Sequence, residues 1–332
     1  MKDISDCKSI IIFNDTSLRS HHGCSRVMEA IKFWLENKKI FILETHFAHK
    51  EIQKNQKLLD AINEADGFII NGEGTFHNGA EKAEHILNFC DQLSSKPVFF
   101  INGIWENNPQ EWLTRLKKFR GVFVRDSKSK ETLLSHDIES HFCPDLSLSL
   151  AYKLNNQIER QNYIVIGDSV RWETRKLLSN LARFNGAQFV PTKTVHYKLL
   201  KKGFLSKALF GFYMNLKPYF FSNYMLPDNV NEYLEVLSKA SGHITGRYHG
   251  VCLSILTETP FLCLKSKTSK VEQLISDIGI NPNRVIGFES IQTISEKDIF
   301  PFDNEELEKI RMFNSNALKC ADNLFTSIFN AL

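Results

Sequence analysis

The chain has 332 residues, a net charge of +3, 42% hydrophobic residues and 24% charged residues. This composition is typical of a soluble globular protein, and the length predicts about two domains. The small net charge argues against a nucleic acid partner. Seven scattered cysteines include no Cys-x-x-Cys pair and no Cys/His spacing typical of a metal site. We therefore expect a reducing compartment, the cytoplasm, with no secretory signal and no membrane span.

In the first half of the chain, apolar runs alternate with amphipathic segments. Residues 10–13 (Ile-Ile-Ile-Phe) are typical of a strand buried on both faces. Strands are expected at residues 10–13, 40–43, 68–70, 98–101 and 122–124, and helices at 25–36, 51–65, 81–93, 111–119 and 127–135. This alternation predicts a parallel, doubly wound sheet, in which ligands bind beyond the carboxyl ends of the strands.

A polar linker at residues 155–162 precedes a second alternating pattern. Strands are expected at residues 163–166, 188–190, 260–264 and 285–288, helices at 172–184, 230–240, 271–278 and 304–332, and one strand and helix within 241–256. We predict an α/β protein of two doubly wound, Rossmann-like domains, at residues 1–154 and 163–332. The architecture is that of B-type glycosyltransferases (GT-B), with the active cleft between the domains.

Residues 241–256 predict a short strand, a polar turn and an amphipathic helix. Arg247 and His249 lie at the start of that helix, and Gly246 and Gly250 flank them. Glycine allows a ligand to approach the backbone closely, and a helix N-terminus attracts anions. The pattern therefore predicts an anion site with a proton donor beside it. The alternative is an arginine that caps a surface loop above a packed histidine.

Three polar loops follow strands of the first half and point to an active cleft. The first, residues 14–23, carries Arg19, His21 and His22. The second, residues 71–79, joins flexible glycines, among them Gly74, to the acid–base groups Glu73 and His77. The third, residues 124–129, contains Arg125 and a candidate helix cap, Ser127. Asp145 either faces the cleft or caps a turn. For each loop, ordinary turn and cap chemistry is the alternative.

Residues 195–225 interrupt the alternating pattern with an aromatic and lysine-rich insertion. Phe204, Phe210 and Phe212 lie among Lys198, Lys201 and other lysines. Such a segment suits a membrane interface, with its apolar face in the bilayer and its lysines at anionic headgroups. The alternative is an insertion that packs on its own domain or against a second subunit of a homo-oligomer.

Together these motifs resemble the polysaccharide pyruvyl transferase family over most of the chain. The Arg-x-His-Gly element at residues 247–250 is the most specific of them. The supporting segments are residues 71–79, residues 123–129 with Leu133, residues 144–146, the strand that begins at Pro260, and residues 267–279. The chain departs from the commoner family pattern at residues 16–23, which carry two histidines, and at Glu73.

The resemblance implies transfer of the enolpyruvyl unit of phosphoenolpyruvate to two hydroxyls of a sugar, forming a pyruvate ketal. The sugar would belong to a bacterial surface glycan or its lipid-linked precursor, at the inner face of the cytoplasmic membrane. Arg125, Arg247 and His249 match donor-binding positions, and His77 is the implied acid. The remaining site residues are expected to be Gly74, Ser127, Gly246 and Gly250 for the donor, and Arg19, His21, His22 and Asp145 for the acceptor.

This chemistry suits the residue types. The two arginines would hold the carboxylate and the phosphate of the donor by bidentate hydrogen bonds. A histidine, His77 or His249, would protonate the methylene carbon, and Glu73 or a second histidine would accept the hydroxyl proton. We expect no metal and no cofactor beyond the donor substrate.

Two other functions fit the same pattern. In a GT-B glycosyltransferase, Arg247 and His249 would bind the phosphates of a nucleotide sugar, and the absence of Asp-x-Asp does not decide the matter. A silent glycan-binding or assembly protein would bind a glycan without turnover, and Arg247→Ala would leave that binding unchanged.

Overall fold

The structure is a computed structural model that describes residues 7–48, 50–52, 55–93, 95–152, 160–194, 209, 212, 223–266 and 268–332. The chain divides into two compact units. Unit 1 comprises Met1–Leu18, Val27–Ser149 and Asn316–Leu332, and unit 2 comprises Arg19–Arg26 and Leu150–Ser315. Arg19–Arg26 and the last residues of the chain are therefore grouped differently from the domain boundaries at 154 and 163 that the sequence suggests.

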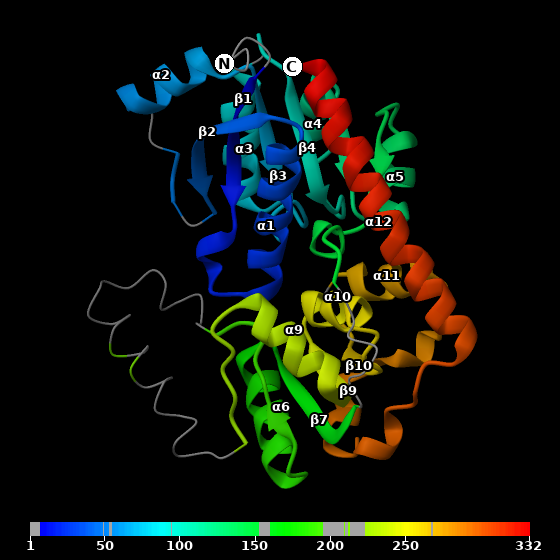
Figure 1. Cartoon of the computed structure of the whole chain (residues 1–332). Coiled ribbons are helices and arrows are strands. Elements are labelled where there is room, and N and C mark those ends of the chain that lie inside the picture. Colours follow the sequence, from blue (N-terminus) through cyan, green and yellow to red (C-terminus); the bar gives the residue numbers. More distant parts are fainter. Residues whose placement is uncertain are drawn as a thin grey trace. The chain divides into compact units, whose positions relative to one another are not determined.

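Unit 1 is built on a parallel sheet that has six strands within the described residues, in the order β2-β1-β3-β4-β5-β6 (Figure 1). The strands are β1 (Lys8–Asp15), β2 (Ile40–Phe47), β3 (Gly67–Asn71), β4 (Val98–Gly103), β5 (Gly121–Val124) and β6 (His141–Phe142). The connecting helices are α1 (His22–Asn37), α2 (Gln56–Glu64), α3 (Glu81–Asp91), α4 (Glu111–Leu116) and α5 (Ser127–Leu134).

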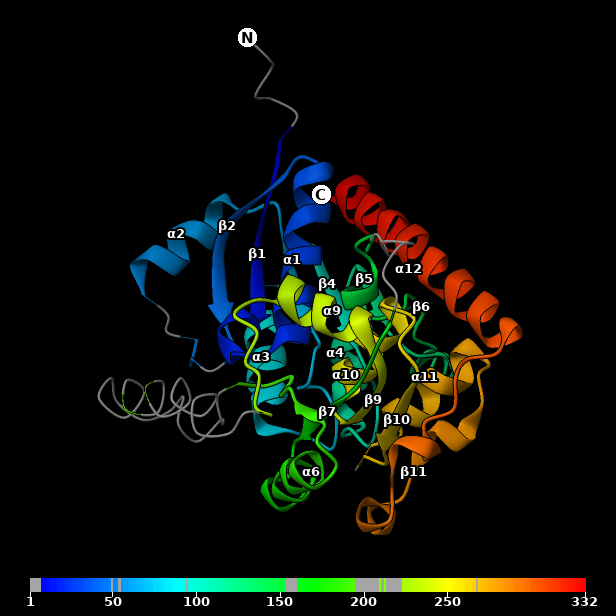
Figure 2. The ribbon, with the colours of Figure 1, turned by 60° about the horizontal axis from the view of Figure 1, so that its bottom comes forward.

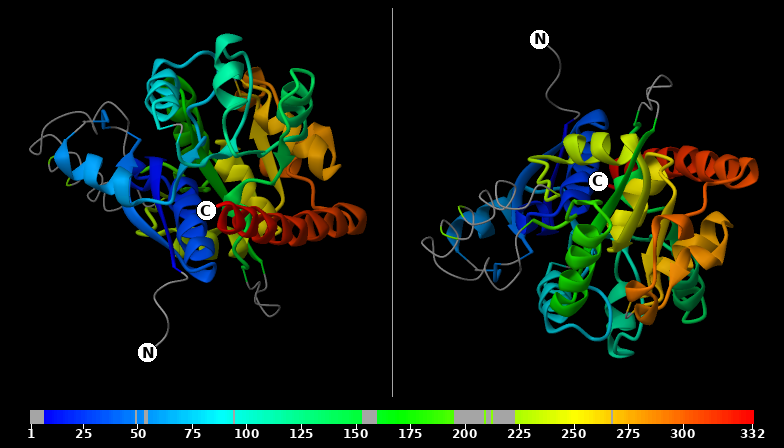
Figure 3. Two further views of the ribbon diagram at one scale, coloured as in Figure 1. Left: turned by 90° about the horizontal axis from the view of Figure 1, so that it is seen from above. Right: turned by 90° about the horizontal axis from the view of Figure 1, so that it is seen from below.

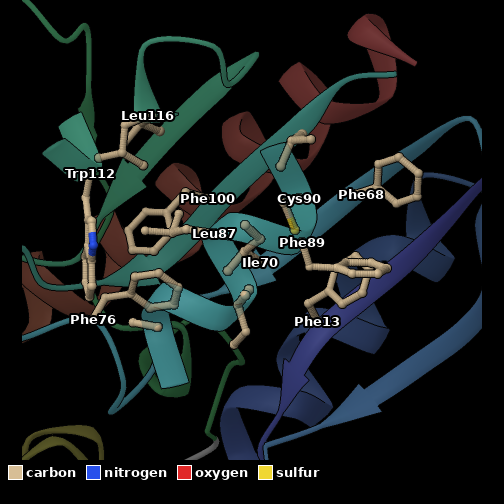
Figure 4. Close-up of a cluster of buried hydrophobic side chains, with 14 of the residues drawn as sticks. Phe13, Phe68, Ile70, Phe76, Leu87, Phe89, Cys90, Phe100, Trp112 and Leu116 are labelled. Carbon is tan, nitrogen blue, oxygen red and sulfur yellow. The ribbon is translucent and has the colours of Figure 1, made fainter. Parts of the chain in front are cut away.

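Aromatic side chains fill the core of unit 1 on one face of the sheet. The rings of Phe76 and Phe100 meet edge to face, with centroids 4.8 Å apart, and Phe13 packs on Phe89 at 5.4 Å. Figure 4 shows these rings with Trp112 in one continuous cluster. Each side chain is almost fully buried, and such aromatic contacts add to the free energy gained by burying apolar area.

Unit 2 repeats the same architecture with a parallel sheet of five strands among the described residues, in the order β11-β10-β9-β7-β8. The strands are β7 (Gln161–Ser169), β8 (Gln188–Phe189), β9 (Ala240–Gly246), β10 (Phe261–Leu264) and β11 (Val285–Ile286). The helices of this unit are α6 (Trp172–Phe184), α9 (Val230–Lys239), α10 (Tyr248–Leu256) and α11 (Lys270–Ile278). Figure 2 shows α6 beside β7, with β9, β10 and β11 following in order.

Each sheet reverses its strand order at one point. In unit 1 the reversal lies between β1 and β3, and in unit 2 it lies between β7 and β9. The two neighbouring crossover connections leave the sheet in opposite directions there, so the carboxyl ends of the two strands border an open crevice where ligands of this fold class bind. These two strand ends are therefore the places to look for functional side chains.

Helix α10 differs from its expected character. The sequence predicted an amphipathic helix, but all nine residues of α10 are buried. The prediction of a solvent-facing side was wrong because α9, β9, β10 and α11 surround the helix within unit 2. Its N-terminus therefore lies in a largely water-excluded environment.

The C-terminal helix α12 (Asn304–Ala331) is one continuous helix, red in Figure 3. The expected insertion at 195–225 lies outside the described residues except for residues 209, 212 and 223–225, so its membrane or subunit contact stays a prediction. The linker at 155–162 is described only from residue 160. Among the described residues, no helix combines the length and apolar character that crossing a bilayer requires.

A buried cation joins the end of the sheet in unit 2 to the start of α12. Arg284 has no exposed surface, and its guanidinium pairs with Glu306 at 2.6 Å. The same group lies 4.2 Å from the ring centroids of Phe300 and Phe302. Backbone carbonyls of Phe300, Pro301 and, at 3.5 Å, Phe261 accept further hydrogen bonds from the guanidinium.

We predict that Arg284→Met and Glu306→Gln each lower the free energy of unfolding by about 3–5 kcal/mol, because each leaves a buried polar group without its partner. In urea unfolding of the full chain, the double variant should lose less than the two single losses combined, by at least about 1 kcal/mol. The matched control is Arg311→Met, which removes an exposed arginine from its pair with the half-buried Glu258 and should cost about 1 kcal/mol or less. Additive single losses would contradict the coupling.

A buried histidine makes unit 2 sensitive to acid. His243 in β9 has no exposed surface, its Nδ1 lies 2.7 Å from Ser254 Oγ, and burial lowers its pKa from 6.5 to about 3. The unfolded chain therefore binds a proton below pH 6.5 that the folded chain does not bind until about pH 3. This contribution to stability is complete above pH 6.5 and falls as the pH drops toward 3.

Between pH 7.5 and 5.0, we expect His243 to reduce the free energy of unfolding by about 2 kcal/mol. His243→Asn should remove that part of the pH dependence, since an amide does not titrate. His136→Asn, which changes an exposed histidine, is the control and should leave the dependence intact. Denaturant titrations at the two pH values measure the free energy of unfolding of each protein. An equal change in that free energy for wild type and His243→Asn would refute the assignment.

Candidate functional site

A buried carboxylate lies where the sheet of unit 2 reverses its order. Asp168, at the carboxyl end of β7, has no exposed surface. Its Oδ2 accepts hydrogen bonds from Arg247 Nη2 at 2.7 Å, Arg247 Nε at 3.1 Å and Arg175 Nη1 at 2.9 Å. Its Oδ1 accepts from the backbone N–H of Thr192 at 3.0 Å. One carboxylate thus fixes two arginines and the loop that follows β8.

Arg247 bridges the end of β9 and the start of α10. It is the N-cap residue of α10 in extended conformation, and its side chain is 12% exposed. Its Nε and Nη2 each donate a hydrogen bond to Asp168, and Nη1 takes no part in these two bonds. The sequence-based placement of Arg247 beside a helix N-terminus is therefore what the structure shows.

The glycines around Arg247 serve packing within the protein. A Cβ added at Gly246 would lie 2.7 Å from Ser169 Cβ, and one at Gly250 would lie 2.3 Å from Thr245 Oγ1. Protein atoms fill the space on the Cβ side of both glycines, and the expectation that they admit a ligand to the backbone stays a prediction. The two glycines let β9 and the first turn of α10 approach their neighbours, which holds Arg247 and His249 in place.

Lys193 adds a third cation. Its backbone N–H lies 3.4 Å from Asp168 Oδ1, and its carbonyl accepts from Arg175 Nη1 at 3.0 Å. Burial, and next the charge of Arg247, lowers the pKa of Lys193 from 10.5 to about 8. Three cationic side chains around one carboxylate give this site an excess of positive charge at neutral pH, which favours an anionic ligand.

The two histidines predicted for the acceptor site behave differently. The His22 ring stacks on Tyr233 with centroids 4.7 Å apart, and burial lowers its pKa from 6.5 to about 4. The His21 ring meets His249 edge to face at 5.4 Å, and burial together with His249 and Arg247 holds its pKa well below 6.5. His21 thus lies in the same cluster as the Arg-x-His element, whereas His22 packs in the core beside it. Arg19 is half-buried in the same segment.

In unit 1, a hydrogen-bonded network occupies the point where the strand order reverses. Asn14 Nδ2, at the end of β1, donates to the carbonyl of Asn71 at 2.6 Å and to Thr75 Oγ1 at 3.2 Å. Thr16 Oγ1 donates to Glu73 Oε2 at 2.5 Å, and Glu73 is only 2% exposed. Asn14 has a φ of 64°, a strained conformation of the kind that clusters at functional sites. Glu73 is thus a buried member of this network.

Arg125 and Asp145, expected to contact different substrates, pair with each other. Arg125 Nη1 lies 2.6 Å from Asp145 Oδ2, with exposed fractions of 3% and 0%. Asp145 also caps the 3-10 turn at Leu146–Leu148 by accepting from the Ser147 N–H. The predicted cap of α5 is also corrected: Asp126 accepts from the Ser129 N–H, while Ser127 is the first helical residue. Because α5 begins at Ser127, where the expected helix at 127–135 also begins, its N-cap is the preceding residue, Asp126.

His77 and Gly74 lie on the loop after β3. His77 is half-buried, and its Nδ1 lies 3.0 Å from Asn78 Nδ2. Gly74 is exposed and has a φ of 65°, a conformation that glycine adopts without strain. The acid–base role of His77 stays a prediction.

Sequence reasoning missed Asp168, Arg175 and Lys193. Asp168 follows a predicted buried strand, so the rule that ligands bind at strand carboxyl ends would have selected it. No comparable signal marks Arg175 or Lys193, since they come to the site only through the helix and the strand that follow β7.

Comparison with solved structures shows the fold. The chain is similar to a UDP-GlcNAc 2-epimerase from Neisseria meningitidis bound to UDP-GlcNAc, with 13% identity and a TM-score of 0.58, covering 97% of this chain and 100% of that one. A UDP-GlcNAc 2-epimerase from Methanocaldococcus jannaschii gives 10% identity and 0.53, covering 97% and 99%. An alpha-glucosyltransferase in complex with UDP and DNA gives 13% and 0.51, also covering 97% and 99%. The predicted fold class, two doubly wound GT-B-like α/β halves, is confirmed.

A comparison with curated protein sequences found no match. A family model, by contrast, matches residues 10–268 and is that of polysaccharide pyruvyl transferase. The match includes both points of strand reversal and the Arg-x-His-Gly element. Because it covers most of the chain, the protein belongs to the polysaccharide pyruvyl transferase family, and it is a polysaccharide-modifying transferase.

Proposed function

We propose that the protein is a pyruvyl transferase that uses phosphoenolpyruvate to form a pyruvate ketal on a sugar of a bacterial surface glycan or its lipid-linked precursor. The observation that carries this proposal is the cationic site of unit 2, in which Asp168 holds Arg247 and Arg175 with Lys193 beside them. Phosphoenolpyruvate is a small, strongly anionic molecule, and such a site suits it. No cofactor other than this donor is part of the proposal.

In the proposed reaction, the methylene carbon of the donor takes a proton and its neighbouring carbon becomes oxocarbenium-like. One sugar hydroxyl adds to that carbon and gives up its proton. A second hydroxyl then displaces phosphate, which leaves with the second proton, so the sum is one ketal and one inorganic phosphate. Arg247 would offset the charge that grows on the leaving phosphate.

The candidate residues of unit 1 have different proposed roles. His77 is the acid for the methylene carbon because it is half-buried and titratable on a loop at a strand carboxyl end. Glu73 and Arg125 are more enclosed, so we propose that they hold the shape of their loops as well as acting on substrate. Gly74, Ser127, Arg19 and Asp145 stay candidate contacts for donor or acceptor.

A GT-B glycosyltransferase is the second candidate. It is favoured by the fold, since the two epimerases and the glucosyltransferase that this chain resembles were solved with UDP or a UDP-sugar. The same cations would bind the diphosphate of a nucleotide sugar. Binding measurements with both donor classes separate the candidates.

We expect phosphoenolpyruvate, and not a panel of nucleotide sugars, to raise the melting temperature of the wild-type protein, since a ligand of the folded state stabilises it by mass action. Arg247→Met should weaken donor affinity by about 10²–10³-fold, equivalent to about 3–4 kcal/mol. Arg183→Met, which changes an exposed arginine in the last turn of α6, is the control and should bind normally. If nucleotide sugars raise the melting temperature and phosphoenolpyruvate does not, the pyruvyl transferase proposal is wrong and the glycosyltransferase is favoured.

We further expect His77→Ala to lower kcat for phosphate release by about 10²–10⁴-fold, while the Kd for phosphoenolpyruvate changes little. The basic limb of the pH–rate profile should also change, because a general acid is active only while it is protonated. His85→Ala, at a largely exposed position of α3, provides the matched control. A His77→Ala enzyme with an unaltered kcat and pH profile would remove His77 from the chemistry.

A further inference from the structure

Two imidazoles and a thiol gather in unit 2 beside the Asp168 cluster. The candidate ligand atoms of His21, Cys24 and His249 all lie within 4.8 Å of one another. The three residues are 9%, 3% and 6% exposed, respectively. Tetrahedral metal sites place nitrogen and sulfur ligands about 2.0–2.3 Å from the ion, so their ligand atoms lie within about 4 Å of one another. Small side-chain movements would bring these three groups to that geometry.

The fold builds this proximity from distant parts of the chain. His21 forms an antiparallel bridge with Lys193, and Cys24 lies in the first turn of α1. His249 lies in the first turn of α10. A Cβ at position 23 would lie 2.2 Å from His249 Cβ, so only glycine allows these two turns to approach so closely. The sequence showed no Cys/His metal spacing because its third member is more than 200 residues away.

The type of ligand narrows the choice of metal. Thiolate and imidazole are ligands for zinc and other late transition metals, whereas magnesium and calcium prefer oxygen. Three protein ligands with one open position are the arrangement of a catalytic rather than a structural zinc ion.

Nearby cationic side chains repel a divalent ion at this position, and nearby anionic groups offset part of that repulsion. Arg247 and Lys193 both act on His21 electrostatically and disfavour a dication there. The Cys24 thiolate and the Asp168 carboxylate offset part of that repulsion. An anion bound by the arginines would offset more and would supply an oxygen for the open position. A neutral His21 that coordinates a metal through Nε2 carries its proton on Nδ1. It therefore loses the long hydrogen bond that Nδ1 accepts from the Cys24 N–H at 3.4 Å.

We propose that His21, Cys24 and His249 bind a zinc ion whose fourth ligand is an oxygen of the anionic substrate. The zinc site itself does not depend on the proposed pyruvyl transfer; only the identity of the anion rests on that function. In this arrangement His249 contributes to donor binding through the metal. Because metal and anion would each favour the other, their coupling must be reciprocal.

The test is a titration of the metal-free full-length protein with Co²⁺, which reports a thiolate ligand by charge-transfer absorption and a tetrahedral site by its visible bands. We expect both signals in wild type. Cys24→Ser should lose the charge-transfer band, and His249→Gln and His21→Gln should each weaken Co²⁺ affinity by more than about 10-fold. Cys320→Ser and His136→Gln, which alter a thiol and an imidazole elsewhere, serve as controls and should titrate like wild type.

Inorganic phosphate should raise the Co²⁺ affinity of wild type several-fold, and Co²⁺ should raise its phosphate affinity by the same factor. Circular dichroism checks that each variant is folded. If Cys24→Ser does not fold, the Co²⁺ affinity of His21→Gln tests the zinc site instead. A wild type without a thiolate band, or a band that survives in Cys24→Ser, overturns the zinc site. Phosphoenolpyruvate binding in the presence of a chelator tests the donor site separately, so the two proposals fail independently.

Discussion

The arrangement of the unit 2 site depends on the buried carboxylate of Asp168. An ionised carboxylate without exposed surface is stable only when charged or polar donors surround it, and here two guanidinium groups and the Thr192 N–H do so. The partners come from the helix after β7, the loop after β8 and the turn after β9. One anion therefore draws three connections of the sheet together and fixes the direction of Arg247.

This constraint explains why the site favours anions. Asp168 neutralises part of the charge of Arg175 and Arg247 and leaves Lys193 as an additional cation. The arginines are already oriented before a ligand arrives, so binding costs little side-chain entropy. A cationic site at the point of strand reversal is compatible with phosphoenolpyruvate and with a nucleotide diphosphate. The fold alone therefore does not select the donor, and membership of the pyruvyl transferase family gives the preference.

Unit 1 places a hydrogen-bonded network of amide, hydroxyl and carboxyl groups at the equivalent point of its sheet. Asn14, Asn71 and Thr75 tie the ends of β1 and β3 together, and Thr16 holds Glu73. Arg125 is neutralised by Asp145 in a pair that is almost fully buried. The two sheets share a strand order, but one presents several cationic side chains at its reversal point and the other a network of amide and hydroxyl groups with the Glu73 carboxyl.

The sequence by itself determined the alternation of strands and helices, because periodicity and flanking polar residues are local signals. It also placed Arg247 and His249 at the start of α10, and the loops after β1, β3 and β5, at strand carboxyl ends. Tertiary structure decided what those residues contact. The pairing of Arg125 with Asp145, the stacking of His22 on Tyr233 and the complete burial of α10 all follow from packing between segments far apart in the chain. The same holds for Asp168 with its arginines and for His21 and Cys24 beside His249, because such contacts depend on strand order, which no local pattern of residues records.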